Sequence, residues 1–118
     1  MAQAEELKER AWIMLRKFGL EENCTGFEDA VMEFKNMEYN LWDLARYVEE
    51  NANTYYEEPC KYLAAVVLLY ITAYDREVST QDFYTAEDLR AVEKRLFKFA
   101  ETRDPSVFNG LYRELDYP

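Results

Sequence analysis

The chain has 118 residues, 49% of them hydrophobic, and its 24 acidic and 14 basic residues give a net charge of −10. Phosphate backbones and anionic lipid surfaces repel a protein this acidic, so we expect no direct binding to nucleic acid or membrane. The chain also has no histidine. This absence excludes His-based catalytic triads, helical Glu-x-x-His iron sites and the usual zinc enzymes.

The length and the scarcity of turn residues favour a single helical domain. A chain of this length fits one domain, residues 1–118, and it contains no internal repeat, linker or low-complexity tract. Three glycines and three prolines are too few for a strand-rich fold, in which turn signals recur every 8–12 residues or so. We therefore predict an all-α protein, a compact bundle of five to six helices.

Hydrophobic periodicity predicts two helices in the first third of the chain. The first runs from about Ala2 to Phe18 and ends at Gly19. Ile13 lies opposite its apolar face, where it either contacts another helix or is exposed. Thr25 to Glu28 resembles a capping box that starts a second helix, which fades near Met37. This second helix buries Phe27, Ala30, Val31 and Phe34.

A third helix is predicted from Asn40 to about Glu57, with Asn40 and Asp43 capping its first turn. Its apolar side faces the core. Along its other side, residues at steps of three and four form a stripe that points away from the core. This stripe consists of Asp43, Tyr47, Glu50, Thr54 and Glu57.

The most apolar stretch of the chain is residues 59–74, in which no charged residue occurs from Tyr62 to Tyr74. A helix that is apolar on every side must be wrapped by other elements. This run is too short to cross a bilayer, which needs roughly 20 apolar residues. We therefore predict that it is the buried central helix, with Pro59 in its first turn and Glu58 at a break in the chain.

After the central helix, residues 75–84 show no sustained period and are predicted to be irregular. Thr85 is the predicted cap of the next helix. That helix turns an apolar face inward and carries an exposed basic ridge of Arg90, Lys94 and Lys98. Asp104 and Pro105 start a short last helix, which Gly110 weakens.

No motif predicts catalysis, a cofactor or a metal site. Cys24 and Cys60 are too far apart in sequence for a Cys-x-x-Cys pair, and the three glycines stand alone rather than in a phosphate-binding loop. A calcium-binding loop starting at Asp75 would have Thr80 where glycine is needed and Ala86 where a glutamate should close the site. We expect a protein that is not an enzyme and binds no cofactor.

The distribution of charge carries the functional prediction. Residues 19–60 contain eleven acidic and two basic residues, nearly the whole charge excess. This pattern predicts a protein-binding module, an inhibitor that occupies a basic groove of a partner such as a nucleic-acid-binding nuclease. Phages and mobile elements use small acidic decoys of this kind, some of them DNA mimics, against CRISPR or restriction nucleases. The predicted partner-binding residues are Glu28, Asp29, Glu33, Tyr39, Trp42, Asp43, Tyr47, Glu50 and Glu57.

Three other interpretations compete with this one. The acidity can serve solubility alone. The chain can form a homodimer or larger homo-oligomer, a structural or adaptor protein in which the basic ridge of one copy meets the acidic stripe of another. An enzyme without histidine would need a pocket that perturbs a carboxylate pKa. The N-terminus has neither the charged nor the apolar region of a secretory signal, so we expect a cytoplasmic protein.

Overall fold

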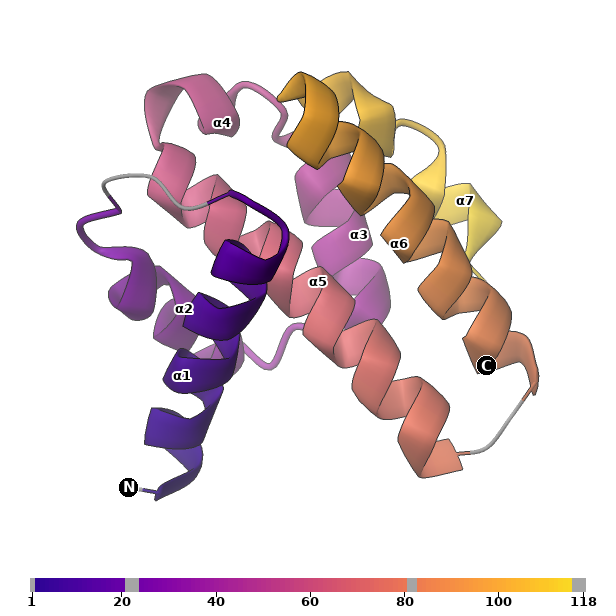
Figure 1. Cartoon of the computed structure of the whole chain (residues 1–118), viewed down its shortest axis with the longest axis horizontal. Helices are drawn as coiled ribbons and strands as arrows, with labels where there is room; N and C mark the ends of the chain where they lie inside the picture. Colours follow the sequence, from indigo (N-terminus) through magenta and orange to yellow (C-terminus); the bar gives the residue numbers. More distant parts are fainter. Residues whose placement is uncertain (1, 21–23, 81–82, 116–118) are drawn as a thin grey trace.

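The computed structural model describes residues 2–20, 24–80 and 83–115, and within these ranges every regular element is helical. Figure 1 shows a bundle in which α5 runs diagonally through the middle, with α1 and α2 on one side and α6 and α7 on the other. The elements are α1 (Ala2–Lys17), α2 (Phe27–Asn36), α3 (Leu41–Glu50), α4 (Thr54–Glu57), α5 (Pro59–Thr80), α6 (Phe83–Thr102), the 3₁₀ helix η1 (Pro105–Phe108) and α7 (Leu111–Glu114). The all-α prediction is confirmed.

Helix α5 is the centre of the bundle, as the apolar run predicted. Its residues from Tyr62 to Ile71 are all buried, and the helix contacts α1, α2, α3, α4 and α6. Pro59 is its first residue, and Glu58 has an extended φ of −138°, as expected before a proline. No helix in the described ranges is long and apolar enough to cross a membrane.

Helix α5 is longer than predicted, because it continues through Asp75 to Thr80. The carboxylate of Asp75 pairs with both terminal nitrogens of Arg10 on α1, at 2.8 and 3.0 Å. Asp75 ends the apolar run in the sequence, but it does not end the helix, because its carboxylate lies at the helix surface and pairs with Arg10. The prediction of an irregular segment over 75–84 is therefore wrong, although residues 81–82 lie outside the described ranges.

The first helix ends as predicted. Gly19 has a φ of +67°, the left-handed conformation that glycine adopts without strain. Its N–H donates to the carbonyl of Arg16, and the N–H of Leu20 donates to the carbonyl of Leu15. These two bonds form a Schellman motif. Ile13 is 46% exposed within the described part of the chain, so of the two predicted alternatives it is the exposed apolar group.

The start of α2 differs from the prediction. Gly26, not Thr25, is the N-cap, with a φ of +86°, and no side chain caps the helix. The Thr25 hydroxyl lies one residue before the cap, so the capping box is absent. The predicted apolar face of α2 is confirmed, because Phe27, Ala30, Val31 and Phe34 are buried.

The capping box at the start of α3 is confirmed. The Asn40 side chain accepts a hydrogen bond from the Asp43 backbone at 2.9 Å, and the Asp43 carboxylate accepts one from the Asn40 backbone at 3.0 Å. Two otherwise unsatisfied backbone donors of the first turn are thereby paired.

We expect Asn40→Ala to lower the free energy of unfolding by about 1 kcal/mol, because the Asp43 backbone N–H loses its acceptor. Urea unfolding followed by circular dichroism measures this change. Asn36→Ala is the matched control, since Asn36 is an exposed residue in the last turn of α2. Equal losses in the two variants would contradict a stabilising cap at Asn40.

The third helix is shorter than predicted. It ends at Glu50, and Asn51 closes it by donating from both its backbone and its side chain to the Tyr47 carbonyl. Asparagine favours helix ends because its amide competes for backbone hydrogen bonds. Thr54 and Glu57 therefore belong to the separate helix α4 and do not continue the predicted stripe.

The sixth helix begins at Phe83, before the predicted cap, so Thr85 is an interior helical residue. Asp88 consequently lies in the second turn, where it is buried. The predicted inner face is confirmed, because Val92, Leu96 and Phe99 are buried.

The C-terminal segment is two short elements instead of one helix. Asp104 caps η1 through the Ser106 N–H at 3.0 Å, as predicted. Gly110, with a φ of +87°, then separates η1 from α7. The backbone N–H of Gly110 donates to the Glu49 carboxylate, which joins this segment to α3.

Candidate protein-binding site

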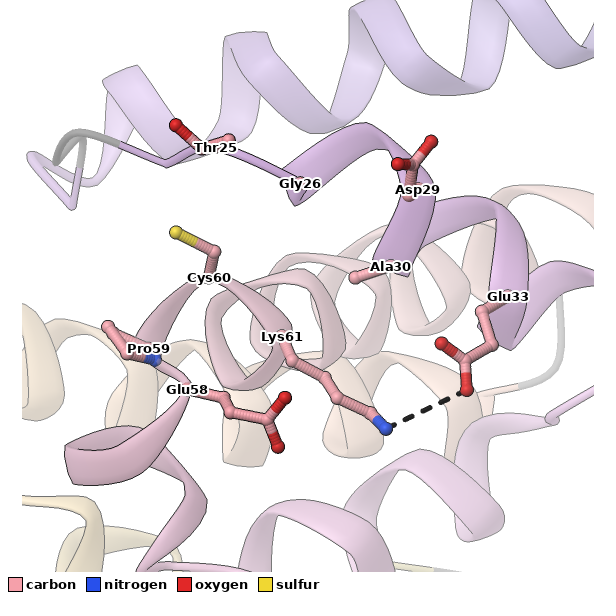
Figure 2. Close-up of a pocket in the computed structure, with 9 residues that line it drawn as sticks. All are labelled: Thr25, Gly26, Asp29, Ala30, Glu33, Glu58, Pro59, Cys60 and Lys61. Carbon is pink, nitrogen blue, oxygen red and sulfur yellow. Dashed lines mark ion pairs between the residues drawn. The ribbon is translucent and has the colours of Figure 1, made fainter.

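Four of the six predicted acidic residues line two hollows on the surface. The first lies where α2 meets the start of α5 and has a volume of about 390 Å³. Figure 2 shows carboxylates from both sides of this hollow, with Pro59, Cys60 and Lys61 at the start of α5. It is lined by Thr25, Gly26, Asp29, Ala30, Glu33, Glu58, Pro59, Cys60 and Lys61. We call this the acid-rimmed hollow.

Negative charge prevails around the acid-rimmed hollow. Asp29, Glu33 and Glu58 contribute three carboxylates, while Lys61 contributes the one ammonium group among its lining residues. Lys61 pairs with Glu33 at 3.7 Å, as the dashed line in Figure 2 marks. Their side chains are 33% and 52% exposed, so solvent screens the pair and it contributes little to stability. The other two carboxylates, Asp29 and Glu58, are exposed and form no ion pair with a residue in the described part of the chain.

The second hollow lies along α3 and has a volume of about 320 Å³. Tyr39 and Tyr47 form its aromatic part. Their rings pack on the buried ring of Phe34, with centroid distances of 5.4 and 5.0 Å. The complete lining is Met37, Tyr39, Asp43, Arg46, Tyr47, Glu50 and Asn51. We call this the tyrosine hollow.

Tyr47 lines the tyrosine hollow, and charges of the acid-rimmed hollow act on it. Burial raises the pKa of its hydroxyl, an effect that a hydrogen bond with Thr54 and the charge of Lys61 partly oppose, while Glu58 adds to it. Glu58 and Lys61 line the acid-rimmed hollow, so Tyr47 lies within electrostatic reach of both sites. A phenol is protonated at neutral pH even at its ordinary pKa near 10, and the raised pKa of Tyr47 extends this range upward, so its hydroxyl can donate a hydrogen bond.

Six of the nine predicted partner-binding residues lie around these hollows. Asp29 and Glu33 line the acid-rimmed hollow, whereas Tyr39, Asp43, Tyr47 and Glu50 line the tyrosine hollow. All four of these carboxylates are exposed, as predicted. Three of them have structural partners as well: Glu33 pairs with Lys61, Asp43 caps α3, and Glu50 pairs with Arg46 at 3.3 Å.

The other three predicted residues lie elsewhere. Glu28 borders hollows beside Trp12 of α1, on the other side of α2. Trp42 is half-buried and packs against the core. Glu57 is exposed on α4 but lines neither the acid-rimmed hollow nor the tyrosine hollow. The break at Asn51 places Glu57 away from the α3 stripe.

Ten of the sixteen lining residues were not predicted, among them Met37, Arg46, Glu58 and Lys61. Two of these four had a signal in the sequence. Glu58 precedes a proline, and such positions favour an exposed break in the chain. Lys61 is the one charged residue in the first turn of an otherwise apolar helix. Met37 is 48% exposed, and no pattern in the sequence predicted this exposure.

The surface around the two hollows offers carboxylates, two phenols and the exposed Met37 side chain. Within the described ranges, no three Cys, Asp or Glu side chains come together in a way that could hold a metal ion. Comparison of the chain with protein-family models, curated proteins and solved structures finds no match.

Proposed function

We propose that this chain is a protein-binding module whose acidic face occupies a basic groove of a partner protein and thereby inhibits it. The acidic face is defined by the carboxylates around the two hollows, Asp29, Glu33, Asp43, Glu50 and Glu58. One observation carries the proposal: exposed carboxylates line two hollows, and one of these hollows also contains two tyrosines whose rings pack on the buried Phe34.

Charge and aromatic groups have different roles in such a contact. Complementary charge mainly raises the association rate and selects the partner. Aromatic residues supply a large share of binding energy when they are held rigidly. Tyr39 and Tyr47 meet this condition, because both rings pack on Phe34. The tyrosine hollow therefore supplies affinity, and the surrounding carboxylates supply selectivity for a basic partner.

A groove that normally holds nucleic acid fits this surface best. Duplex DNA carries one negative charge per roughly 1.7 Å of its axis. A protein groove that neutralises such a density presents many Lys and Arg side chains, and a compact acidic protein can occupy it in place of DNA. A nucleic-acid-binding nuclease is the class of partner we propose, and the inhibition would be competitive with its substrate.

The test is affinity capture from a nuclease-treated bacterial lysate, followed by purification of the captured protein. The test variant is Asp29→Lys, Glu50→Lys, Glu58→Lys, which leaves the Asp43 cap intact. The matched control is Glu9→Lys, Glu87→Lys, Glu101→Lys, three exposed acids outside the acidic face. Both variants change the net charge from −10 to −4, so they differ only in where the charge is reversed.

We expect the test variant to bind the purified partner about 100-fold more weakly, at roughly 1 kcal/mol per reversed residue, with most of the loss in the association rate. The control variant should bind the partner like the native protein. Duplex DNA should compete with the native protein and with the control variant for the partner's groove. Equal weakening in the two variants would mean that net charge alone governs binding. Failure of DNA to compete would exclude a nucleic-acid groove.

A further inference from the structure

A second surface has the opposite character and lies on α6. Arg90, Lys94 and Lys98 are exposed along it at intervals of four residues, and none of the three forms an ion pair with any residue in the described part of the chain. Like charges at this spacing destabilise a helix. Phe97 lies among them with 56% of its surface exposed. We call these four residues the cationic ridge.

The Phe97 ring is held in place from below. It packs on Phe18 of α1 at a centroid distance of 5.5 Å, and Phe18 packs edge-on against Tyr70 of α5 at 5.1 Å. The ammonium group of Lys17 lies 5.9 Å from the Phe18 ring and 5.8 Å from the Tyr70 ring. A supported but exposed aromatic ring loses little conformational entropy on binding, which makes it a suitable anchor.

Glu93 and Glu101 stand four residues before and after Phe97 on α6, but the three cations Lys17, Lys94 and Lys98 near the ring outnumber them. This excess of positive charge favours an acidic partner, and the same chain offers one. The acid-rimmed hollow has an apolar floor of Ala30, Pro59 and Cys60 beneath its carboxylates. Its Asp29 and Glu33 are four residues apart on α2, and Lys94 and Lys98 are four residues apart on α6. Both pairs therefore have the same rise of about 6 Å along their helices.

We propose that the cationic ridge of one copy docks on the acid-rimmed hollow of a second copy. Phe97 enters the hollow, and Lys94 and Lys98 lie opposite Asp29 and Glu33. The contact joins two different surfaces, so each copy keeps one free ridge or hollow, and association continues into a closed ring or an open chain. Net charge opposes it, so the attraction is local and is weakened by salt.

This contact needs no foreign protein and stands independently of the proposed function. It uses one of the two hollows of the acidic face, so a self-associated copy cannot offer that hollow to a basic partner. Self-association would therefore compete with partner binding.

Sedimentation velocity of the purified chain over a range of concentrations, at low and high salt, tests the proposal. Phe97→Ser, Lys94→Gln, Lys98→Gln removes the three residues of the cationic ridge that enter or face the hollow, keeps Arg90, and leaves the hollow intact. Asp29→Asn, Glu33→Gln neutralises the hollow and leaves the ridge intact. All five positions are exposed, and circular dichroism verifies that each variant is folded.

We expect the native chain to sediment faster as its concentration rises, and each variant alone to remain monomeric. An equimolar mixture of the two variants should give a 1:1 dimer that grows no further, because only one ridge and one hollow remain. A native chain that stays monomeric at all concentrations would overturn the proposal. Association of the hollow variant with itself would also overturn it, since the ridge would then bind another surface. Neither result bears on binding to a basic partner, which the capture experiment measures separately.

Discussion

Replacing Phe99 by alanine is expected to lower the free energy of unfolding by about 3 to 5 kcal/mol, a large part of the roughly 5 to 15 kcal/mol that stabilises a domain. Phe99 is fully buried and lies at the centre of an aromatic cluster. Its ring centroid is 5.1 Å from Tyr55, 6.1 Å from Tyr62 and 5.4 Å from Phe108. Truncation leaves a cavity where α4, α5, α6 and η1 meet.

Phe97→Ala is the matched control, because it makes the same chemical change two residues earlier on the same helix. Its ring is 56% exposed, so we expect a loss of about 1 kcal/mol or less. Urea unfolding of both variants measures the difference. Similar losses at the two positions would mean that α6 presents a different face to the core.

The sequence predicted the centre of the fold well because burial on every side leaves an unmistakable pattern. Residues 62–71 contain no charge, and the structure buries all of them. The two sides of α6 were predicted for a related reason. Apolar residues at helical spacing face inward, whereas Arg90, Lys94 and Lys98 face outward.

Helix ends were predicted less well, because competing local signals decide them. Asp75 interrupts an apolar run without ending the helix, since its carboxylate finds Arg10 on α1, 65 residues away. Thr25 and Thr85 both have the residue type of a cap, but neither is one in the structure. Asn40 does cap its helix, because the Asp43 carboxylate three residues later accepts a hydrogen bond from the Asn40 backbone and completes a capping box.

The exposure of the candidate site residues could be predicted from the sequence, but their grouping could not. Exposure follows from residue type, so the acidic residues were correctly placed on the surface. Their grouping depends on how the helices meet. Asn51 ends α3 and removes Glu57 from the stripe, while the break before Pro59 brings Glu58 to the hollow that Asp29 lines. A local sequence pattern cannot predict that α2 and the start of α5 lie side by side, because this depends on tertiary packing.

Tyr62→Phe is expected to change how stability depends on pH. The Tyr62 hydroxyl is buried and donates a hydrogen bond of 2.6 Å to the Val48 carbonyl, which joins α5 to α3. Near pH 8 the variant should be less stable than the native protein by about 1 kcal/mol, because this bond is lost. Burial raises the pKa of this phenol above the usual value near 10, and nearby Tyr47 and Tyr56 add to the shift.

The sign of the pH effect follows from the raised pKa. Between the unfolded and folded pKa values the folded state binds more protons, so the stability that Tyr62 contributes is complete below about pH 10 and is lost as the pH rises further. The loss is about 1.4 kcal/mol per pH unit. The variant lacks this group in both states, so its deficit should close near pH 11 and then reverse.

Urea unfolding at pH 8, 10 and 11.5 measures both effects. Tyr74→Phe is the control, because it removes a phenol whose residue is 43% exposed and whose charge is not among those that raise the Tyr62 pKa. The control keeps the Tyr62 phenol, so it should also keep the native loss of stability at high pH. If the deficit of Tyr62→Phe stayed constant up to pH 11.5, the Tyr62 phenol would be ionising without cost in the folded protein, and the contact between α5 and α3 at Val48 would have to be open to solvent.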